Sequence, residues 1–460
     1  MTTYKQELSR ELSLRQNILI TLSAVTPASS VFIIVPTVLL SLGGASVLAM
    51  AIAALIAMFV GMCYAELSSR YPISGGEYTW AARVLGKPVG FAVMLLTMVS
   101  GIFIIPVIAL GTGMYLGVAI PSLSGNNVGL LVIVITTAIA ALRIKTNAWV
   151  TGVFLAIEIL SVLLLTVLGA IHINRPISTF WTPTAINDAG MMQSVSWGLV
   201  ASLLSVSLFA YNGYGASVYY AEETRNASNK IGKAIMVALL ITVVVEILPL
   251  MAVVLGTGSL DKMLADPAPI NYFLLERGGK SLNILVSVGI AVAIINAVIA
   301  IIIQIGRLIY SSARDGSWPD FIGKPLGSIN KRFDTPIVST VLAGAISLLV
   351  GKFVSFNFLL LATGASLILV YAIVAIAALK LRSMGEGHKN SYKMKFWPIP
   401  PIIVIVAIIY IAYEGIKVDT RPILISLITM SIGIIYYYLY IHSRRSSRWT
   451  LPEALHHHED

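Results

Sequence analysis

Two acidic side chains lie deep inside apolar stretches of this sequence, where an ionised group is costly. Glu158 falls within residues 148–170 and Glu246 within residues 232–257. If these stretches cross a membrane, a charge there costs roughly 2.5 to 3.5 kcal/mol on insertion scales, so such groups usually serve a function. A carboxyl group there could relay a proton, pair with a cationic ligand, or remain neutral and hydrogen-bonded between helices. We take both acids as candidate coupling residues, and the purely structural role stays open for each.

Helix breakers interrupt two other apolar stretches, residues 21–36 and 209–227. Pro27 breaks the first because proline lacks an N–H and clashes with the preceding turn. In the second, Gly213 supplies backbone freedom beside Asn212. A broken helix exposes unpaired N–H and C=O groups, which is tolerated only where the backbone faces protein or a water-filled cavity. Half-helix N-termini then favour a carboxylate, and freed carbonyls accept from an ammonium group.

The breaks therefore predict a small-molecule site between the two interrupted stretches, and an amino acid zwitterion suits such a site. A proline kink in a packing helix and an aromatic-rich packing surface are the structural alternatives. Asn296, on a later stretch, could contact the substrate or bridge helices. The candidate substrate-binding residues are Pro27, Ala28, Ser29, Ser30, Phe209, Ala210, Tyr211, Asn212, Gly213 and Asn296.

The composition predicts an all-α integral membrane protein. Hydrophobic residues make up 57% of the chain and charged residues 11%, with a mean hydropathy of +0.88. About 20 apolar residues are needed to cross a hydrocarbon core of roughly 30 Å. About 12 spans can be drawn, at residues 17–39, 42–67, 84–118, 127–142, 148–170, 195–219, 232–257, 281–311, 335–350, 355–380, 398–414 and 422–442.

The basic residues predict the orientation of these spans, because Lys and Arg are retained in cytoplasmic loops. With the N-terminus inside, 24 of the 31 basic residues fall in inside segments, and both termini are then cytoplasmic. The same residues are dispersed over seven short segments, so the net charge of +10 indicates topology rather than nucleic-acid binding. The expected location is the cytoplasmic membrane, with lipid around a multi-pass chain.

Several classes of function are disfavoured. No long hydrophilic stretch could form a soluble catalytic domain, and no GxxxxGK[ST] phosphate-binding loop occurs. Cys63 is the single cysteine, and the six histidines form no ligand-spaced set, so neither a metal site nor a cofactor is expected. A membrane enzyme is therefore a poor interpretation. A nutrient sensor would need a signalling extension longer than the tail after Ser443.

Four sequence elements carry a resemblance to a known family. They are RYPISGGEYTWAARVLGKPVG at 70–90, the stretch 209–235 with Glu222, Glu223 and Asn226 in E-E-x-x-N order, ARDGSWP followed by TP within 307–336, and YKMKFWPIPP at 392–401. In this order they resemble the amino acid-polyamine-organocation (APC) transporter superfamily over nearly the whole chain.

The resemblance implies a 5+5 inverted repeat (LeuT-like) with broken first and sixth spans and two additional C-terminal helices. It predicts a cytoplasmic N-terminal segment at 1–16, one transporter domain at 17–442, and a cytoplasmic tail at 443–460. Repeat one would cover about 17–170, repeat two about 195–380, and the extra helices about 398–442. By position, the resemblance also implies a cytoplasmic gate of charged residues, namely Glu66, Glu222, Glu223, Arg307, Arg314 and Asp315.

The chain departs from the family pattern at two places. Ala28-Ser29-Ser30 stands where the family commonly has Gly-Ser-Gly, so a carboxylate cradle there has lost two glycines. Glu158 lies near where several proton-coupled relatives carry a lysine. Sodium coupling in this fold needs an adjacent pair of hydroxyl residues on the eighth span, and residues 284–310 contain no such pair. Proton coupling or exchange is therefore expected.

The predicted function is secondary active transport of an amino acid by alternating access, as a proton-coupled symporter or an exchanger. A transporter of polyamines or other organic amines is the alternative, favoured by the lost glycines and by Glu158. The expected partners are the small-molecule substrate, protons and membrane lipid, with no nucleic acid.

Overall fold

Twelve membrane crossings can be traced in the computed structural model of this chain. The structure describes residues 12–72, 75–142, 148–187, 189–221, 224–330, 332–333, 335–385, 392–443 and 449. Within these residues, nine segments are long and apolar enough to cross a membrane, and the first of them, Leu14–Arg70, contains two crossings. Asn126–Ala141 and Ile337–Phe353 are shorter apolar helices that complete the set. The count agrees with the about 12 spans predicted from the sequence.

Most crossings in the described part of the chain are continuous helices, and two are interrupted. The interrupted first crossing consists of α1 (Leu14–Val25), α2 (Pro27–Ser29), η1 (Ser30–Ile34) and α3 (Val35–Leu42), and the sixth consists of α9 (Trp197–Ala210) and η5 (Tyr214–Tyr220). The other crossings are α4 (Ser46–Arg70), α6 (Lys87–Ala119), α7 (Asn126–Ala141), α8 (Ala148–Ala170), α10 (Ala227–Gly256), α12 (Pro269–Arg314), α14 (Ile337–Phe353), α15 (Phe356–Leu381), α16 (Ile399–Val418) and α17 (Arg421–Tyr436), which η7 (Tyr437–His442) extends. Near its start α12 is kinked at Gly279, whose φ of +71° is not helical.

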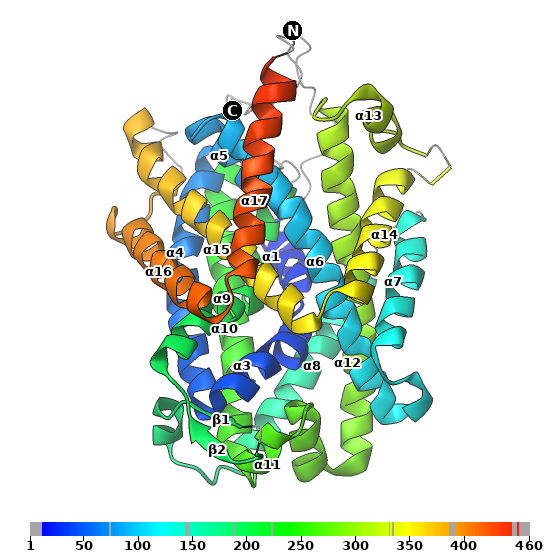
Figure 1. Ribbon diagram of the computed structural model, residues 1–460, viewed down its shortest axis with the longest axis vertical. Coiled ribbons are helices and arrows are strands. Elements are labelled where there is room, and N and C mark those ends of the chain that lie inside the picture. The colour runs from blue at the N-terminus through cyan, green and yellow to red at the C-terminus, as the bar shows by residue number, and fades with distance from the viewer. Residues whose placement is uncertain are drawn as a thin grey trace.

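Because the number of crossings is even, α1 begins and η7 ends at the same end of the bundle, which we call the terminal face. The short helices α5 (Glu77–Val84) and α13 (Asp320–Leu326) lie at this face (Figure 1). The opposite end, the far face, carries α11 (Leu260–Ala265) and a hairpin of β1 (Thr184–Ile186) and β2 (Met192–Ser194). The stretches 173–194 and 258–280, which join crossings at this face, thus contain short elements.

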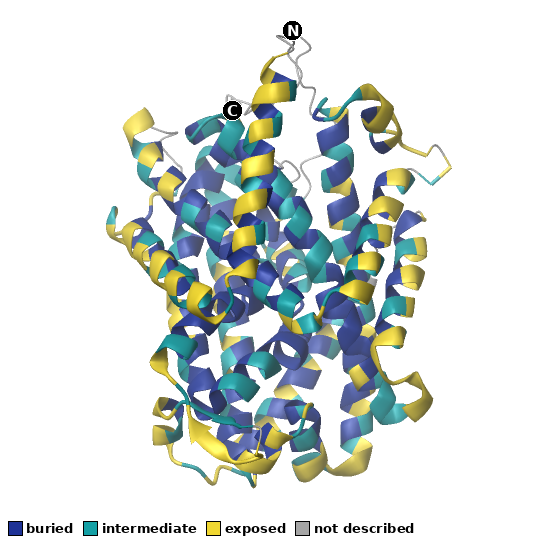
Figure 2. Cartoon of the chain, in the orientation of Figure 1, coloured by how far each residue is buried: buried dark blue, intermediate teal, exposed yellow. Residues whose placement is uncertain are grey.

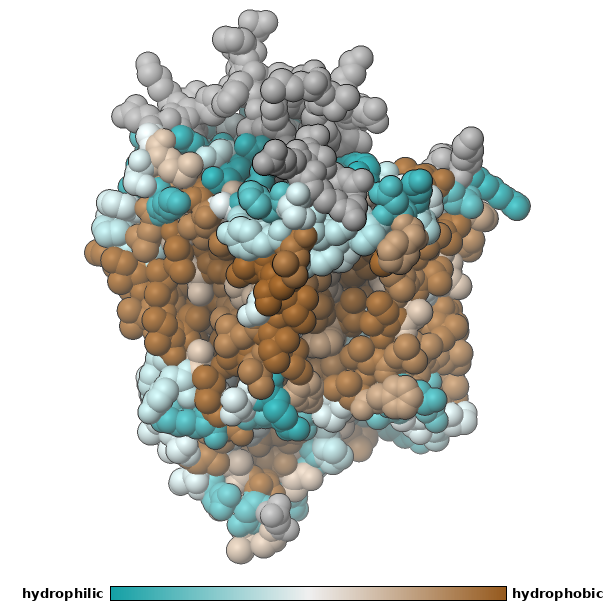
Figure 3. Space-filling model, turned by 45° about the horizontal axis from the view of Figure 1, so that its top comes forward, coloured by the Kyte–Doolittle hydropathy of each residue, from teal (hydrophilic) through white to brown (hydrophobic). Residues whose placement is uncertain are grey.

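The chemistry of the surface fits a bilayer. Buried residues concentrate in the middle of the bundle. Along peripheral helices such as α16 and α17, exposed residues alternate with less exposed ones (Figure 2). Many of the exposed residues are large and apolar, for example Val406 and Ile409 on α16. In the space-filling view these side chains form a hydrophobic belt between two hydrophilic ends (Figure 3). Such a belt is the surface expected of a protein whose solvent is lipid.

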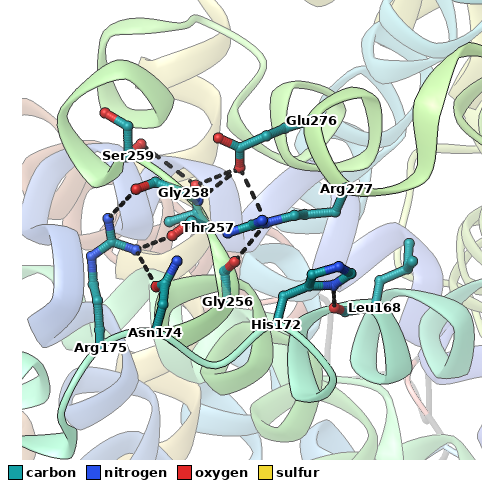
Figure 4. A network of polar contacts seen from close by, with 10 residues as sticks. All are labelled: Leu168, His172, Asn174, Arg175, Gly256, Thr257, Gly258, Ser259, Glu276 and Arg277. Atoms are coloured by element: carbon teal, nitrogen blue, oxygen red, sulfur yellow. Dashed lines mark hydrogen bonds and ion pairs between the residues drawn. The ribbon is translucent and has the colours of Figure 1, made fainter.

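A polar network at the far face joins the ends of three crossings (Figure 4). Arg175, just after α8, donates to the carbonyl of Thr257 and, at 3.2 Å, to that of Gly258, beyond the end of α10. Glu276 of α12 accepts from the Thr257 hydroxyl at 3.1 Å and from the Gly258 N–H at 2.9 Å. Arg277 donates to the last carbonyl of α10 at 2.8 Å. The network pairs backbone groups that helix ends leave unsatisfied.

The first crossing is broken at Thr26, one residue before the proline that predicts the break. Thr26 has φ +50° and ψ +66°, a left-handed conformation that ends α1, and Pro27 then begins α2. A proline restricts the residue before it away from the right-handed helical region, and its missing N–H is harmless at the first position of a helix. Pro27 therefore starts the second half of the crossing rather than sitting in the gap.

Candidate functional site

The two breaks touch each other in the middle of the bundle. Gly213 has φ +120°, and a Cβ atom added to it would lie 2.7 Å from the Cα atom of Val25, at the end of α1. Only glycine combines this conformation with so close an approach of two backbones. From the other half of the first crossing, the Ser30 hydroxyl donates to the carbonyl of Ala210 at 2.8 Å. That carbonyl is at the end of α9, where the helix itself provides no partner.

A cavity of about 150 Å³ lies beside this contact. Four of the predicted substrate residues line it: Ser30, Phe209, Asn212 and Gly213. The other polar lining residues, none of which was predicted from the sequence, are Thr26, Tyr64, Glu77, Thr97, Ser100, Tyr219 and Gln304. Because Glu77 is the first residue of α5, the cavity extends from the breaks towards the terminal face.

The remaining predicted substrate residues lie outside the lining of this cavity. Pro27, Ala28 and Ser29 form the single turn of α2 and are buried behind the break. Tyr211 is also buried, and its hydroxyl donates to the carbonyl of Met50 at 3.1 Å. Ala210 takes part through its carbonyl, and Asn296 lies on α12, half-buried and away from the cavity.

Both intramembrane acids flank the broken first crossing. Glu158 of α8 and Glu246 of α10 are fully buried. The backbone amide of Ala28 lies close to the first carboxyl group, and the hydroxyl of Ser30 lies close to the second. No carboxylate oxygen of either residue makes a hydrogen bond of regular geometry within the described structure, and the hydroxyl of Ser29 between them has no partner either. The half-helix that begins at Pro27 thus lies between two carboxyl groups.

A third acid, Glu77, faces the cavity among tyrosines. Its Oε1 accepts from the Tyr64 hydroxyl at 2.9 Å and its Oε2 from the Tyr219 hydroxyl at 3.4 Å. The Tyr64 ring packs edge to face against Tyr214 and Tyr371, with centroids 5.6 Å and 6.0 Å away. Burial raises the pKa of Glu77, which lies outside the membrane-spanning segments. The only sequence signal for this residue was its place in the family-like Gly-Gly-Glu-Tyr loop.

The far-face side of the breaks is closed. Phe32 of η1 and Tyr115 of α6 are buried and meet edge to face with ring centroids 5.8 Å apart. The Tyr115 hydroxyl also donates to the carbonyl of Phe32. A ligand in the cavity is therefore separated from the far face by packed aromatic rings, whereas the cavity reaches α5 on the terminal side.

Four of the charged residues predicted for the gate, Glu66, Arg307, Arg314 and Asp315, lie among the described residues. Glu66 makes a bidentate ion pair with Arg382, at 2.7 and 3.1 Å, and accepts from the N–H of Met394 at 2.9 Å. Arg314 pairs with its neighbour Asp315 at 3.1 Å. Burial raises the pKa of Asp315, and Arg314 acts in the opposite direction.

Two further gate predictions concern α12 and the segment after η5. Arg307 is exposed and makes no ion pair with another residue that the structure describes. Glu222 and Glu223 lie outside the described residues. Arg382, which was not among the residues predicted for the gate, is the cation that pairs with Glu66. Among the described residues, no cluster of three His, Cys, Asp or Glu side chains is arranged to hold a metal ion.

Comparisons with known proteins agree with this architecture. The family model described as amino acid permease matches residues 12–440. The chain is similar to the branched-chain amino acid permease BcaP of Bacillus subtilis, at 23% identity over 97% of this chain and 96% of the relative. It is also similar to the methylthioribose transporter of the same organism, at 25% identity over 91% and 90%. A third relative is the low-affinity putrescine importer PlaP of Escherichia coli, at 22% identity over 84% of each chain.

These relatives are membrane transporters and permeases rather than enzymes, and the family acts on small molecules. The match spans both broken crossings and the cavity between them. The chain therefore belongs to the amino acid permease family of the amino acid-polyamine-organocation transporter superfamily.

Proposed function

We propose that the protein is a secondary active transporter that moves an amino acid across the cytoplasmic membrane by alternating access, as a proton-coupled symporter or an exchanger. One observation carries the proposal: the cavity between Ser30 on the first crossing and Asn212 on the sixth, at the point where both helices are broken. Backbone groups freed at such breaks can bind both ends of a zwitterion. The permease relatives support an amino acid as the substrate.

The proposal includes an orientation and a conformation. The excess of Lys and Arg in the segments on the side of the termini supports a cytoplasmic terminal face. The cavity extends to α5 on that side, and Phe32 and Tyr115 close the other side, which supports an inward-facing state. Transport then requires the contact between Phe32 and Tyr115 to open, while the terminal side closes. The transporter domain would be residues 17–442, with short cytoplasmic segments on either side.

Coupling is assigned to Glu158 and Glu246. A carboxyl group without a counter-ion in an apolar interior favours its neutral, protonated form. Loss of the proton leaves a carboxylate beside the amide of Ala28 or the hydroxyl of Ser30, and either group stabilises the charge better if it approaches. Each protonation step therefore biases the position of the half-helix that begins at Pro27, and this half-helix also contributes to the substrate cavity. The proton and the substrate then both bias the position of this half-helix.

We assign the terminal-face gate to Glu66 with Arg382, together with Arg307, Arg314 and Asp315. Arg382 also lies over the ring of Trp397, with 5.1 Å from its Cζ atom to the ring centroid, so it ties α4 to the start of α16. Such pairs can separate and re-form as the bundle moves. Glu222 and Glu223 belong to the same proposal by their position in the sequence.

Reconstitution tests this function. Purified protein in liposomes is given labelled amino acids or amines with a proton gradient, a sodium gradient, or unlabelled amino acid inside. We expect uptake of at least one amino acid that is driven by the proton gradient or by exchange and is indifferent to sodium. Uptake driven by sodium alone would contradict the coupling, and a protein that carries amines but no amino acid would contradict the substrate.

Transport of an organic amine is a second candidate function, and one observation favours it. Among the described residues that line the cavity, Glu77 is the only charged one, so the lining carries no cation to neutralise a carboxylate. The putrescine importer among the relatives supports the same substrate class. The uptake screen above separates the two candidates directly.

A further inference from the structure

The position of Glu77 suits its carboxylate to bind a positively charged group of a ligand. It lines the cavity, and within the described structure its carboxylate accepts hydrogen bonds from the hydroxyl groups of Tyr64 and Tyr219. No Lys, Arg or His of the described structure lies within ion-pair distance of its carboxylate. A carboxylate in a half-buried site normally pairs with a cation, because burying an unpaired charge is costly.

The surroundings of Glu77 suit a ligand cation in other ways. The carboxylate lies against the sixth crossing, since a Cβ atom added to Gly215 would be 3.4 Å from its Oε1 atom. The rings of Tyr64 and Tyr219 line the same end of the cavity, and aromatic faces attract ammonium groups. The amide of Gln304 is also part of the lining and offers a neutral acceptor. One charge surrounded by neutral acceptors and rings is a site for an alkylammonium group.

We propose that Glu77, with Tyr64 and Tyr219, forms a subsite for the cationic end of the substrate, so that this transporter accepts amino acids with a cationic side chain or diamines. The inference rests on the proposed function, because it assigns the cavity to the substrate. The other end of such a ligand then lies near Ser30 and Asn212, at the breaks. The cavity thus offers polar groups both at Glu77 and at the breaks, which suits a ligand with two polar ends.

Protons compete with the ligand at this subsite. Burial raises the pKa of Glu77, and the hydroxyls of Tyr64 and Tyr219 partly oppose this by donating to the carboxylate. The titratable groups that face it are the phenols Tyr64 of α4, Tyr214 and Tyr219 of η5, and Tyr371 of α15, and a phenol, with an ordinary pKa near 10, is neutral at physiological pH. Lowering the pH through the pKa of Glu77 neutralises the carboxylate and removes its attraction for a cation. Binding of the cation should therefore strengthen as the pH rises and release a proton.

The test compares ligands and variants that differ in one charge. Melting temperatures of the purified full-length protein are measured against increasing cadaverine, L-lysine or L-norleucine, for the wild type and for Glu77→Gln. Gln keeps an oxygen that can accept from a tyrosine hydroxyl but carries no charge. Glu77→Asp keeps the charge. Glu414→Gln is the control, because Glu414 on α16 pairs with Lys417 and does not line the cavity.

We expect cadaverine or L-lysine to stabilise the wild type. The same stabilisation of E77Q should need about a tenfold higher ligand concentration, because a hydrogen bond to a charged group is lost. E77D should retain part of the affinity, and E414Q should behave as the wild type. Between about pH 6 and 8, where alkylammonium groups stay charged, the affinity of the wild type should rise and that of E77Q should stay flat. A melting temperature below wild type for E77Q does not affect this readout, since each variant serves as its own baseline.

Two results would overturn the inference. One is stabilisation of E77Q and wild type by the same concentrations of the cationic ligands. The other is the absence of any effect of cadaverine and L-lysine on the wild type. Failure of the proposed function is distinguishable, because it shows as the absence of amino acid or amine uptake in liposomes. A wild type that accumulates only neutral amino acids, unaffected by E77Q, refutes the subsite and leaves the transport function intact.

Discussion

The contact between the two breaks can be tested by adding a single methyl group. Gly213→Ala places a Cβ atom 2.7 Å from the Cα atom and 3.1 Å from the backbone nitrogen of Val25, at the end of α1. Both neighbours belong to the main chain, so no side-chain rotation can relieve the overlap. The end of α1 must then move away from the sixth crossing. This movement would separate the two halves of the site that the cavity lies between.

Two contributions set the expected loss of stability in G213A. Holding an L-residue in a backbone conformation that favours glycine costs about 1 to 3 kcal/mol. Forcing a methyl group into a packed contact adds about 1 to 3 kcal/mol more. Gly125→Ala is the matched control, because Gly125 has φ +88° and open space around its added Cβ atom, so it carries the first cost without the second.

Thermal unfolding and ligand binding of the two variants give the readouts. We expect G213A to melt below G125A and to lose the stabilisation that substrate confers on the wild type, while G125A keeps it. Uptake in liposomes should fall in the same order. A G213A protein that binds and transports as well as G125A would refute the reasoning that the two breaks form one site through this contact.

The other predictions concern the buried acids and the terminal-face ion pair. Glu158→Gln and Glu246→Gln mimic protonated carboxyls that have no regular hydrogen-bond partners in the described structure, so stability should change by about 1 kcal/mol or less. In liposomes each should lose proton-driven accumulation and keep exchange, and unaltered driven accumulation in both would contradict the coupling role. Arg382→Ala leaves the 7%-exposed side chain of Glu66 without its bidentate partner, which should cost about 2 to 3 kcal/mol in unfolding experiments. Arg421→Ala removes a comparable pair whose Arg is 74% exposed and should leave the melting temperature nearly unchanged; equal losses in the two variants would contradict the structural role of Arg382.

The positions of the breaks were predictable because they depend on local chemistry. Pro27 has no N–H, and Gly213 adopts φ +120°, a conformation for which few other residues are suited. The exact residue was less predictable. The interruption falls on Thr26, because a proline constrains the residue before it, whereas the proline itself fits the start of a helix.

The composition of the cavity was predictable only in part. Ser30 and Asn212 line it as expected of residues at the breaks, but the faces that Ala28 and Ser29 present depend on how a single helical turn packs against α8 and α12. Glu77 reaches the cavity because the loop between α4 and α6 folds back into the bundle as α5, and local sequence does not reveal this path.

The ion pairs at the terminal face were beyond sequence reasoning for a different reason. The segments on one side of a membrane contain many charges, and topology alone cannot say which of them meet. Glu66 pairs with Arg382, which lies 316 residues away along the chain. Only the packing of α15 against α4 selects this cation from the other basic residues at the same face.

Substrate protection of a cysteine in the cavity tests whether this cavity is the transport site. In a Cys63→Ala background, Ser100→Cys places a thiol in the lining of the cavity between the breaks, and Ser202→Cys places one in a separate cavity of about 200 Å³. The rate of thiol labelling is measured in liposomes with and without the amino acid or amine that they accumulate. We expect the substrate to slow the labelling of S100C and to leave the labelling of S202C unchanged. Equal labelling of S100C with and without substrate would contradict the assignment of this cavity as the transport site.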